Sequence, residues 1–335
     1  MLGFLGSKSG NLFGIDIGSS SVKLVSLSGG SGHYSLDSYA VVALPHGAVT
    51  EGSIKDSGVV AEVIEKAVKV AGNKKTGESS AVTAVQSSAV ITKRIEMSNA
   101  LSDFDLEDQI KIEADQFIPY PIEEVALDFE VIGPAEHSPN LNSVLLVACR
   151  QTDVEEREDA ISSAGLKCKV IDVDTFAIER AYPLFSAEQP DDKLVGIVDI
   201  GASTLTLNVF KGKEIVYTRE QTFGGNDLTN AISQQYGMVV LPFRGTVAQQ
   251  VSRSLQFFYS SGSHHHELSA LYLSGGTAAI DGLAEQLQEE IGITTYMANP
   301  FSKMKVNARV NTARLERDAP SLIKACGLAM RGFED

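Results

Sequence analysis

The chain has 335 residues, of which 43% are hydrophobic and 21% are charged, and this composition excludes collagen, a coiled coil and wholesale disorder. Such a length predicts about two domains of roughly 150 residues. The formal net charge of −15 disfavours nucleic acid and anionic lipid as partners. No apolar stretch reaches the roughly 18 residues of a membrane span, and the first ten residues do not resemble a secretory signal, so we expect a cytoplasmic protein without direct membrane insertion.

Two segments about half a chain apart share one pattern. GIDIGSSSVKLVSL at 14–27 aligns without a gap with IVDIGASTLTLNVF at 197–210. Each segment predicts an apolar strand that ends at an aspartate, a tight Gly/Ser turn and a second strand of alternating polarity, which together make a β-hairpin. The repeat predicts a duplicated chain in which each half begins with this hairpin.

The rest of the first half alternates between strands and helices. Periodicity predicts strands over 39–44, 80–85, 90–97, 125–132, 144–149 and 169–173. It predicts helices over 59–71, 103–117, 154–164 and 175–184. The stretch from 86 to 165 reads as a small α+β unit inserted into the first domain, and the polar stretch 186–192 reads as a linker.

The second half continues with helices over 227–236 and 246–259 and with a strand over 270–273. It also contains two glycine pairs, in FGGNDLT and in LYLSGGTAAIDGL, and each pair precedes a predicted helix. A helix N-terminus favours a nucleotide packed on the glycines, although each pair alone is also compatible with an ordinary helix start. The candidate residues are Gly224, Gly225 and Asn226 in the first motif and Gly275, Gly276 and Thr277 in the second.

The turns of the two hairpins have the chemistry of a phosphate site. Glycine allows close backbone approach, free amides and hydroxyls donate to phosphate oxygens, and a carboxylate can hold Mg²⁺ through water. One such turn is weak evidence, whereas two copies in duplicated halves are strong evidence. The residues are Asp16, Gly18, Ser19, Ser20, Ser21 and Lys23 in the first turn and Asp199, Gly201, Ala202, Ser203 and Thr204 in the second.

These turns, the Gly-Gly turn and the helix ACGLAMRG at 325–332 resemble the actin, Hsp70 and sugar-kinase superfamily. More closely, the run from SSAVITKRIEM through QIKIEADQFIPYPIEEVALDFEV, IDVDTFAIERAY and TREQTFGGNDLT to ANPF resembles the PilM family of type IV pilus assembly, over nearly the whole chain. The resemblance implies an actin-like α/β fold of duplicated RNase-H-like domains with an inserted α+β subdomain of the FtsA type. It implies a first domain at 1–85 and 166–190, the insert at 86–165, a second domain at 191–226 and 268–310, a shortened helical subdomain at 227–267, and a C-terminal segment at 311–335 that returns to the first domain.

The resemblance also implies a cofactor and partners. Members of the family bind ATP, so the hairpin turns would be phosphate loops, 275–277 the adenosine turn and 224–226 an approach from the other side, with Mg²⁺ at Asp16 and Asp199 through water. Such proteins hold the cytoplasmic N-terminal peptide of the inner-membrane protein PilN. Through it they join PilO and PilP, communicate with the pilus motor ATPase and platform protein, and lie at the inner membrane.

The partner groove is expected on the insert and at its junction with the first domain. A buried core would explain the apolar members of this set equally well. The candidates are Ile91, Ile95, Phe117, Pro119, Tyr120 and Pro121.

Hydrolysis of ATP needs a side chain that orients water in line with the γ-phosphate, and Asp174 is the candidate. An alternative role for Asp174 is the N-cap of the helix that follows. No other carboxylate is singled out, so we expect slow or no hydrolysis, with the nucleotide acting as a clamp between domains.

The sequence departs from the family pattern at Gly237 and Met238, which lead almost directly to Leu241. A helix and loop that would cover the adenosine are missing there, which weakens the expected adenosine wall. The alternative function is an FtsA-like filament, and self-association stays open, although the final residues lack the basic amphipathic helix that would tether such a filament to a membrane. A small-molecule kinase would need larger insertions than the chain has room for.

Overall fold

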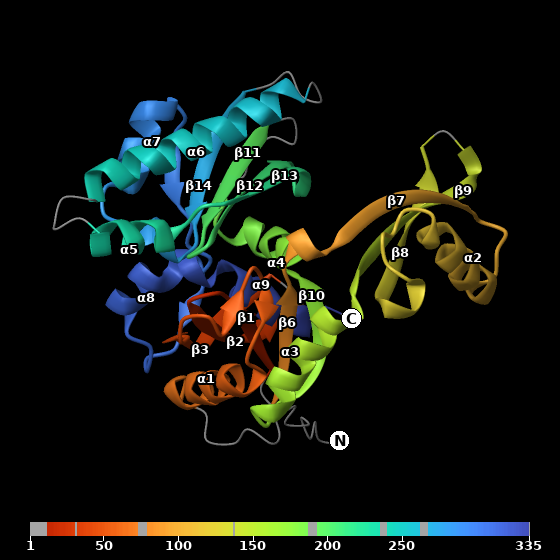
Figure 1. Cartoon of the computed structure of the whole chain (residues 1–335), viewed down its shortest axis with the longest axis horizontal. Coiled ribbons are helices and arrows are strands. Elements are labelled where there is room, and N and C mark those ends of the chain that lie inside the picture. The colour runs from red at the N-terminus through yellow and green to blue at the C-terminus, as the bar shows by residue number, and fades with distance from the viewer. Residues whose placement is uncertain are drawn as a thin grey trace, which may run out of the picture.

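Two mixed β-sheets form the body of the molecule, and a smaller sheet stands to one side of them (Figure 1). This computed structural model describes residues 12–30, 32–72, 79–136, 138–186, 193–234, 240–261 and 267–334. Within those ranges, no helix combines the length and apolarity needed to cross a bilayer. Most of the expected linker at 186–192, together with Gly237 and Met238, lies outside them.

The first sheet has the strand order β10-β6-β1-β2-β3-β16. Its strands are β1 (Leu12–Ile17), β2 (Ser21–Gly30), β3 (His33–Ala43), β6 (Ser80–Val85), β10 (Lys167–Val173) and β16 (Lys305–Val306). The first three strands form an antiparallel meander, whereas β6 runs parallel to β1 and β10 runs parallel to β6. Because side chains alternate along a strand, Phe13 and Ile15 face one side of the sheet and Gly14 faces the other.

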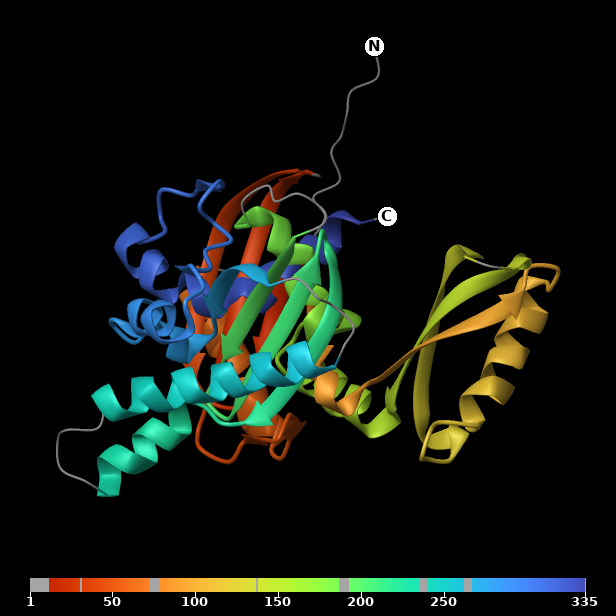
Figure 2. The same ribbon diagram turned by 90° about the horizontal axis from the view of Figure 1, so that it is seen from above.

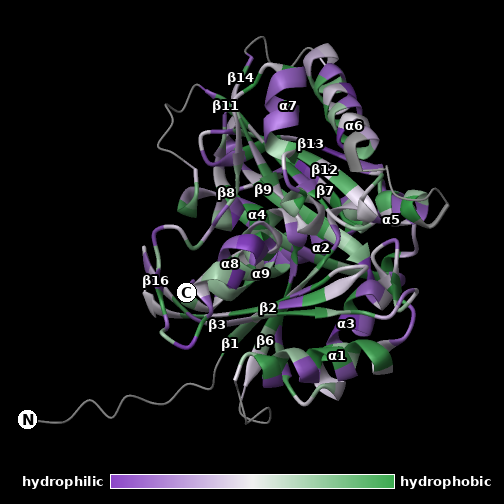
Figure 3. Ribbon diagram, turned by 90° about the vertical axis from the view of Figure 1, so that its left-hand side faces the viewer, coloured by the Kyte–Doolittle hydropathy of each residue, from purple (hydrophilic) through white to green (hydrophobic). Residues whose placement is uncertain are grey.

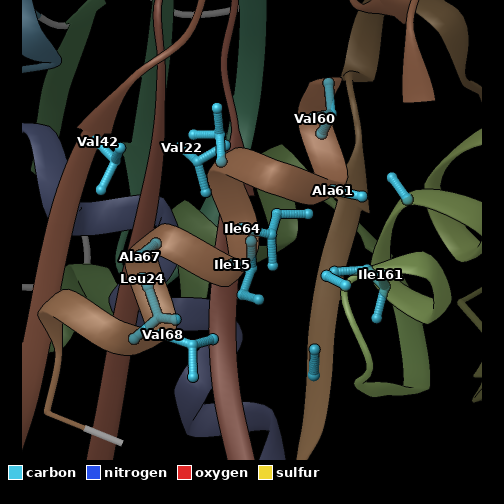
Figure 4. Close-up of a cluster of buried hydrophobic side chains, with 14 of the residues drawn as sticks. Ile15, Val22, Leu24, Val42, Val60, Ala61, Ile64, Ala67, Val68 and Ile161 are labelled. Atoms are coloured by element: carbon cyan, nitrogen blue, oxygen red, sulfur yellow. The ribbon is translucent and has the colours of Figure 1, made fainter. Parts of the chain in front are cut away.

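Helices cover both faces of this sheet, and they are α1 (Ser57–Val70), α3 (Gln151–Ser163), α4 (Asp174–Ala181) and α9 (Ile323–Met330). The apolar side of α1 packs on Ile15 (Figure 4), and the alternation of green and purple along α1 in Figure 3 reflects one buried face and one solvated face. On the opposite side, α9 packs against β1 and α4. A Cβ atom on Gly14 would collide with the backbone of Ala325 and Ala329, so glycine lets α9 lie directly on the sheet.

The position of α3 differs from the expectation. We expected this helix inside the inserted unit at 86–165, but Ala160 and Ile161 are buried with α1 in the core of the first sheet (Figure 4). Periodicity identifies the apolar face of a helix and not the element that covers it. The small side chains on this face let α3 pack closely beside α1, so α3 belongs to the first sheet.

The second sheet has the order β13-β12-β11-β14-β15. Its strands are β11 (Leu194–Ile200), β12 (Thr204–Lys211), β13 (Glu214–Thr222), β14 (Leu268–Ser274) and β15 (Thr295–Met297). β11 is antiparallel to β12 and parallel to β14, as β1 is antiparallel to β2 and parallel to β6. The order therefore repeats β3-β2-β1-β6-β10, and the sequence repeat is also a repeat of topology.

Helices α5 (Gly225–Gln234), α6 (Val240–Ser260) and α7 (Leu283–Ile291) accompany this second sheet. On α6, Val247, Val251, Leu255 and Phe258 form a stripe with helical spacing that is buried against the sheet. The stripe fixes α6 across the sheet, with α7 packed beside it.

The smaller sheet has the order β7-β9-β8 and one covering helix, formed by β7 (Ile91–Ser98), α2 (Asp103–Asp115), β8 (Val125–Ala135) and β9 (Ser138–Arg150). It has its own core around Ile110, Val144 and Leu146. Figure 2 shows it clear of the two large sheets, to which β7 and β9 connect it. Further elements are the hairpin of β4 (Val49–Thr50) and β5 (Ser53–Ile54) and the helix α8 (Thr312–Asp318).

Candidate functional site

A cavity of about 400 Å³ lies between the two large sheets, at the ends of β1 and β11. Both hairpin turns line the cavity. In the first turn every residue from Asp16 to Lys23 except Val22 contributes, and in the second every residue from Asp199 to Thr204 except Ile200. The glycine motifs of the second half reach it as well, although Gly224 does not line it. The structure thus brings together segments that lie far apart in the sequence, because the duplicated topology places equivalent turns face to face.

The two turns are in direct contact. The Ser203 hydroxyl donates a hydrogen bond to the Ser19 hydroxyl at 3.0 Å, and the Asn226 side-chain amide donates to Ser203 at 3.2 Å. These groups are also hydrogen-bond donors of the kind that phosphate oxygens accept. If a phosphate bound between the turns, Ser19 and Ser203 would donate hydrogen bonds to its oxygens in place of the bond between their two hydroxyls.

The motifs of the second half support one another. The backbone amide of Gly225 donates to the carbonyl of Gly201 at 3.0 Å, and the Thr277 hydroxyl donates to the same carbonyl at 2.7 Å. A Cβ atom on Gly224 would lie 2.6 Å from the carbonyl oxygens of Gly201 and Ala202. Gly224 therefore serves the packing of the turn, which explains why it is not part of the cavity wall.

The two glycines after β14 have different roles, one in packing and one in lining the cavity. Gly275 has φ +90°, and a Cβ atom there would collide with the backbone of Ile200, so this position requires glycine. Beside Gly276, in contrast, a Cβ atom would meet nothing within 4 Å, although Gly276 lines the cavity. This leaves open space beside the Gly276 backbone, where a planar group could rest.

Two lysines balance the carboxylates of the cleft. Lys23 lies 2.9 Å from Asp16, and Lys324 lies 2.9 Å from Asp174 and 3.0 Å from Asp199. Burial opposes the charged form of Lys324, but the two carboxylates outweigh it and raise the pKa of Lys324 well above its ordinary value. Burial likewise opposes the charged form of Asp199, but Lys324 and the Ser274 hydroxyl lower the pKa of Asp199. Lys324 and Asp199 are therefore both charged at neutral pH.

Asp174 lines the cavity but is not an N-cap. α4 begins at Asp174 itself, its N-cap is Val173, and no side chain caps this end. One carboxylate oxygen of Asp174 accepts the Ser87 amide at 2.8 Å, and the other faces Lys324. The alternative N-cap role is wrong, and both oxygens of Asp174 already have donors.

Sequence reasoning missed Lys324 and Arg157, both of which line the cavity. Lys324 directly precedes ACGLAMRG, and a lone lysine in such an apolar stretch is the signal that could have identified it. Arg157 is 4% exposed and donates to the carbonyls of Ala84 and Gly52 at 2.7 Å each. It holds the β4–β5 hairpin against β6 at the rim of the cavity.

The donor set fits a phosphate-bearing ligand better than a directly bound metal. Among the residues that the structure describes, no group of three or more His, Cys, Asp or Glu side chains is arranged to hold a metal ion. The two carboxylates expected to face Mg²⁺, Asp16 and Asp199, are each paired with an ammonium group. Contact with Mg²⁺ through water remains compatible with this geometry.

A second cavity, of about 910 Å³, lies at the junction of the smaller sheet with the first large sheet. Its lining includes Leu127, Phe129, Val147, Phe176 and Pro183, from β8, β9, α4 and the turn after α4. Charged side chains of both signs surround this apolar floor, among them an ion pair between Arg180 and Asp172 at 3.1 Å.

The six partner candidates from the sequence do not line this second cavity. Ile91, Ile95, Phe117 and Tyr120 pack against the core of the smaller sheet. Pro119 and Pro121 are exposed. The candidates lie beside this cavity without lining it, because Ile91 directly follows Val90, which does line it, and the guanidinium of Arg150, at the end of β9 that leads into α3, lies 4.2 Å from the centre of the Tyr120 ring.

Comparison with known proteins gives matches over nearly the whole chain. The family model for the type IV pilus assembly protein PilM matches residues 14–240 and 238–333, and its two parts meet next to Gly237 and Met238, where the sequence departs from the family pattern. The chain is similar to the structure of a PilM–PilN type IV pilus biogenesis complex, with 29% identity, a TM-score of 0.79, and coverage of 97% of this chain and 99% of that one.

A more distant similarity concerns the fold alone. The ethanolamine utilization protein EutJ from Carboxydothermus hydrogenoformans is 15% identical, with a TM-score of 0.54 and coverage of 95% of this chain and 88% of that one. The duplicated sheets have the actin-like α/β fold that the sequence predicts. With a family model that spans nearly all of it, the chain belongs to the PilM family of type IV pilus assembly proteins.

Proposed function

We propose that this protein is a nucleotide-binding scaffold of the type IV pilus machinery that holds the N-terminal cytoplasmic peptide of a PilN-like protein. The observation that carries the proposal is the similarity, over nearly the full length of both chains, to a PilM–PilN complex. Binding to such a peptide would recruit the protein from the cytoplasm to the inner membrane. Through it the scaffold would join PilO and PilP and communicate with the pilus motor.

The cavity between the large sheets is the proposed ATP site. The triphosphate would lie between the turns of β1–β2 and β11–β12, where Ser19, Ser203 and backbone amides supply donors. The adenosine would rest on the open backbone at Gly276. Mg²⁺ would arrive on the phosphates, whose charge it neutralises, and would meet Asp16 and Asp199 through water. Since both oxygens of Asp174 are engaged, we expect slow hydrolysis or none.

The junction cavity is the proposed peptide groove. A short peptide with apolar side chains needs an apolar floor for its anchors and a polar rim for its backbone. Leu127, Phe129 and Phe176 supply apolar lining, and Arg180 is one of the charged residues that also line the cavity. An alternative contact surface on the insert stays the set of six candidates, Ile91, Ile95, Phe117, Pro119, Tyr120 and Pro121.

Titration of a labelled PilN N-terminal peptide, with and without Mg-ATP, tests the proposal. We expect saturable binding that Phe176→Ala weakens about tenfold, because truncation of a buried anchor typically costs 1 to 2 kcal/mol or more. Phe104→Ala is the matched control, since Phe104 is 73% exposed on α2 and lies outside both cavities. Absence of binding would contradict the scaffold role, and equal affinity for wild type and Phe176→Ala would contradict the location of the groove.

A further inference from the structure

The ammonium group of Lys324 joins carboxylates from the two halves of the molecule. Asp174 is the first residue of α4, on the side of the first sheet, and Asp199 lies near the end of β11 in the second sheet. Lys324 belongs to the first turn of α9, which packs on α4. Only 20% of the Lys324 side chain is exposed, against 12% for Asp174 and 14% for Asp199, so the three charges meet largely away from water.

This position is where a divalent ion directly bound to the protein would lie. Carboxylates that face a phosphate site are commonly bridged by a divalent cation. Here Asp199 has the Ser274 hydroxyl on one oxygen at 2.9 Å and Lys324 on the other. Asp174 is engaged in the same way, by the Ser87 amide and by Lys324. Every oxygen of the pair therefore has a donor before any metal arrives.

One ammonium group faces both carboxylates, because Lys324 lies 2.9 Å from Asp174 and 3.0 Å from Asp199. Asp16 has a separate ammonium partner in Lys23. The cavity lining thus includes four carboxylates, Asp16, Glu51, Asp174 and Asp199, and three basic side chains, Lys23, Arg157 and Lys324.

We propose that Lys324 is the built-in cation of the nucleotide site. It takes the place between Asp174 and Asp199 that a protein-bound divalent ion would occupy, so the cleft holds nucleotide without ligating a metal ion itself. The part of this inference that concerns nucleotide rests on the proposed function, whereas the exclusion of a divalent ion from the carboxylate pair can be measured without any nucleotide.

The first experiment titrates Mn²⁺ into the nucleotide-free protein and follows free Mn²⁺ by electron paramagnetic resonance. Wild type is expected to bind no Mn²⁺ that Mg²⁺ displaces. Lys324→Gln is expected to bind one such ion, because it leaves two carboxylates without a counter-charge. Lys303→Gln, a change at an exposed lysine outside the cleft, is the control and should behave as wild type. Stoichiometric Mn²⁺ binding by wild type, or none by a folded Lys324→Gln variant, would overturn the inference.

The second experiment needs no variant. The affinity of wild type for a fluorescent ATP analogue is measured with excess Mg²⁺ and with EDTA. We expect binding to persist in EDTA, weakened only by the loss of the ion that neutralises the phosphates, whereas complete loss of binding in EDTA would overturn the inference. No nucleotide binding under either condition would contradict the proposed function instead, and the Mn²⁺ titration would still decide the role of Lys324.

Discussion

At the scale of single residues, the shape of the cleft depends on two glycines whose missing Cβ atoms leave room for different neighbours. Gly275 and Gly276 are adjacent and identical, yet they meet different constraints. Gly275 has φ +90° and faces the backbone of β11, while Gly276 faces open space in the cavity. Their sequence is the same, so only the structure separates the packing role from the binding role.

The difference predicts opposite results for two alanine substitutions. Gly275→Ala should lower the free energy of unfolding by about 1 to 3 kcal/mol, because alanine must adopt a left-handed conformation and also displace Ile200. Gly276→Ala should leave stability within about 0.5 kcal/mol of wild type but weaken nucleotide binding, since its methyl group enters the proposed adenosine surface. Urea unfolding and nucleotide titration of both variants test this. Equal loss of stability in the two variants would contradict the assignment.

At the scale of elements, the local sequence pattern predicts the hairpins and helices, but it does not predict which elements they pack against. The strand expected over 80–85 is β6 (Ser80–Val85), and the helix expected over 59–71 is α1 (Ser57–Val70), because a clear period of two or 3.6 residues defines each one. β9 (Ser138–Arg150) begins six residues before the expected 144–149, since its polar first half shows no alternation. The contact of α3 with α1 depends on tertiary packing, which periodicity does not encode.

The packing of α9 on α4 is the clearest contact between elements that depends on one small residue. A Cβ atom on Gly327 would collide with the backbone of Ala177. Gly327→Ala should therefore destabilise the protein by about 1 to 3 kcal/mol through separation of the two helices.

Gly245→Ala on α6 is the matched control for that substitution. Its new methyl group would lie 3.7 Å from the nearest atom, so alanine should stabilise the helix by up to about 1 kcal/mol. Thermal unfolding of the two variants compares them directly. A Gly327→Ala variant as stable as Gly245→Ala would contradict the close α4–α9 packing.

At the scale of the whole molecule, duplication explains the cleft. The same strand order in both sheets sets the β1–β2 turn opposite the β11–β12 turn, which is why the sequence repeat predicted that both turns line one cavity. Lys324 was not predicted, because its partners are more than 120 residues away in sequence and only the packing of α9 brings them together. The junction cavity was not predicted in detail for the same reason, since β8, α4 and the C-terminal residues meet there only in three dimensions.

The junction cavity is the proposed groove for the peptide of a PilN-like partner. Hydrogen–deuterium exchange of the full chain, with and without that peptide at saturation, would locate the bound peptide. We predict slower exchange in β8, β9 and α4, which line the cavity, and no change in α7, which does not. Unchanged exchange in β8, β9 and α4 would contradict this location of the groove. That holds whether the peptide protects only the six candidates (Ile91, Ile95, Phe117, Pro119, Tyr120 and Pro121) or no segment at all.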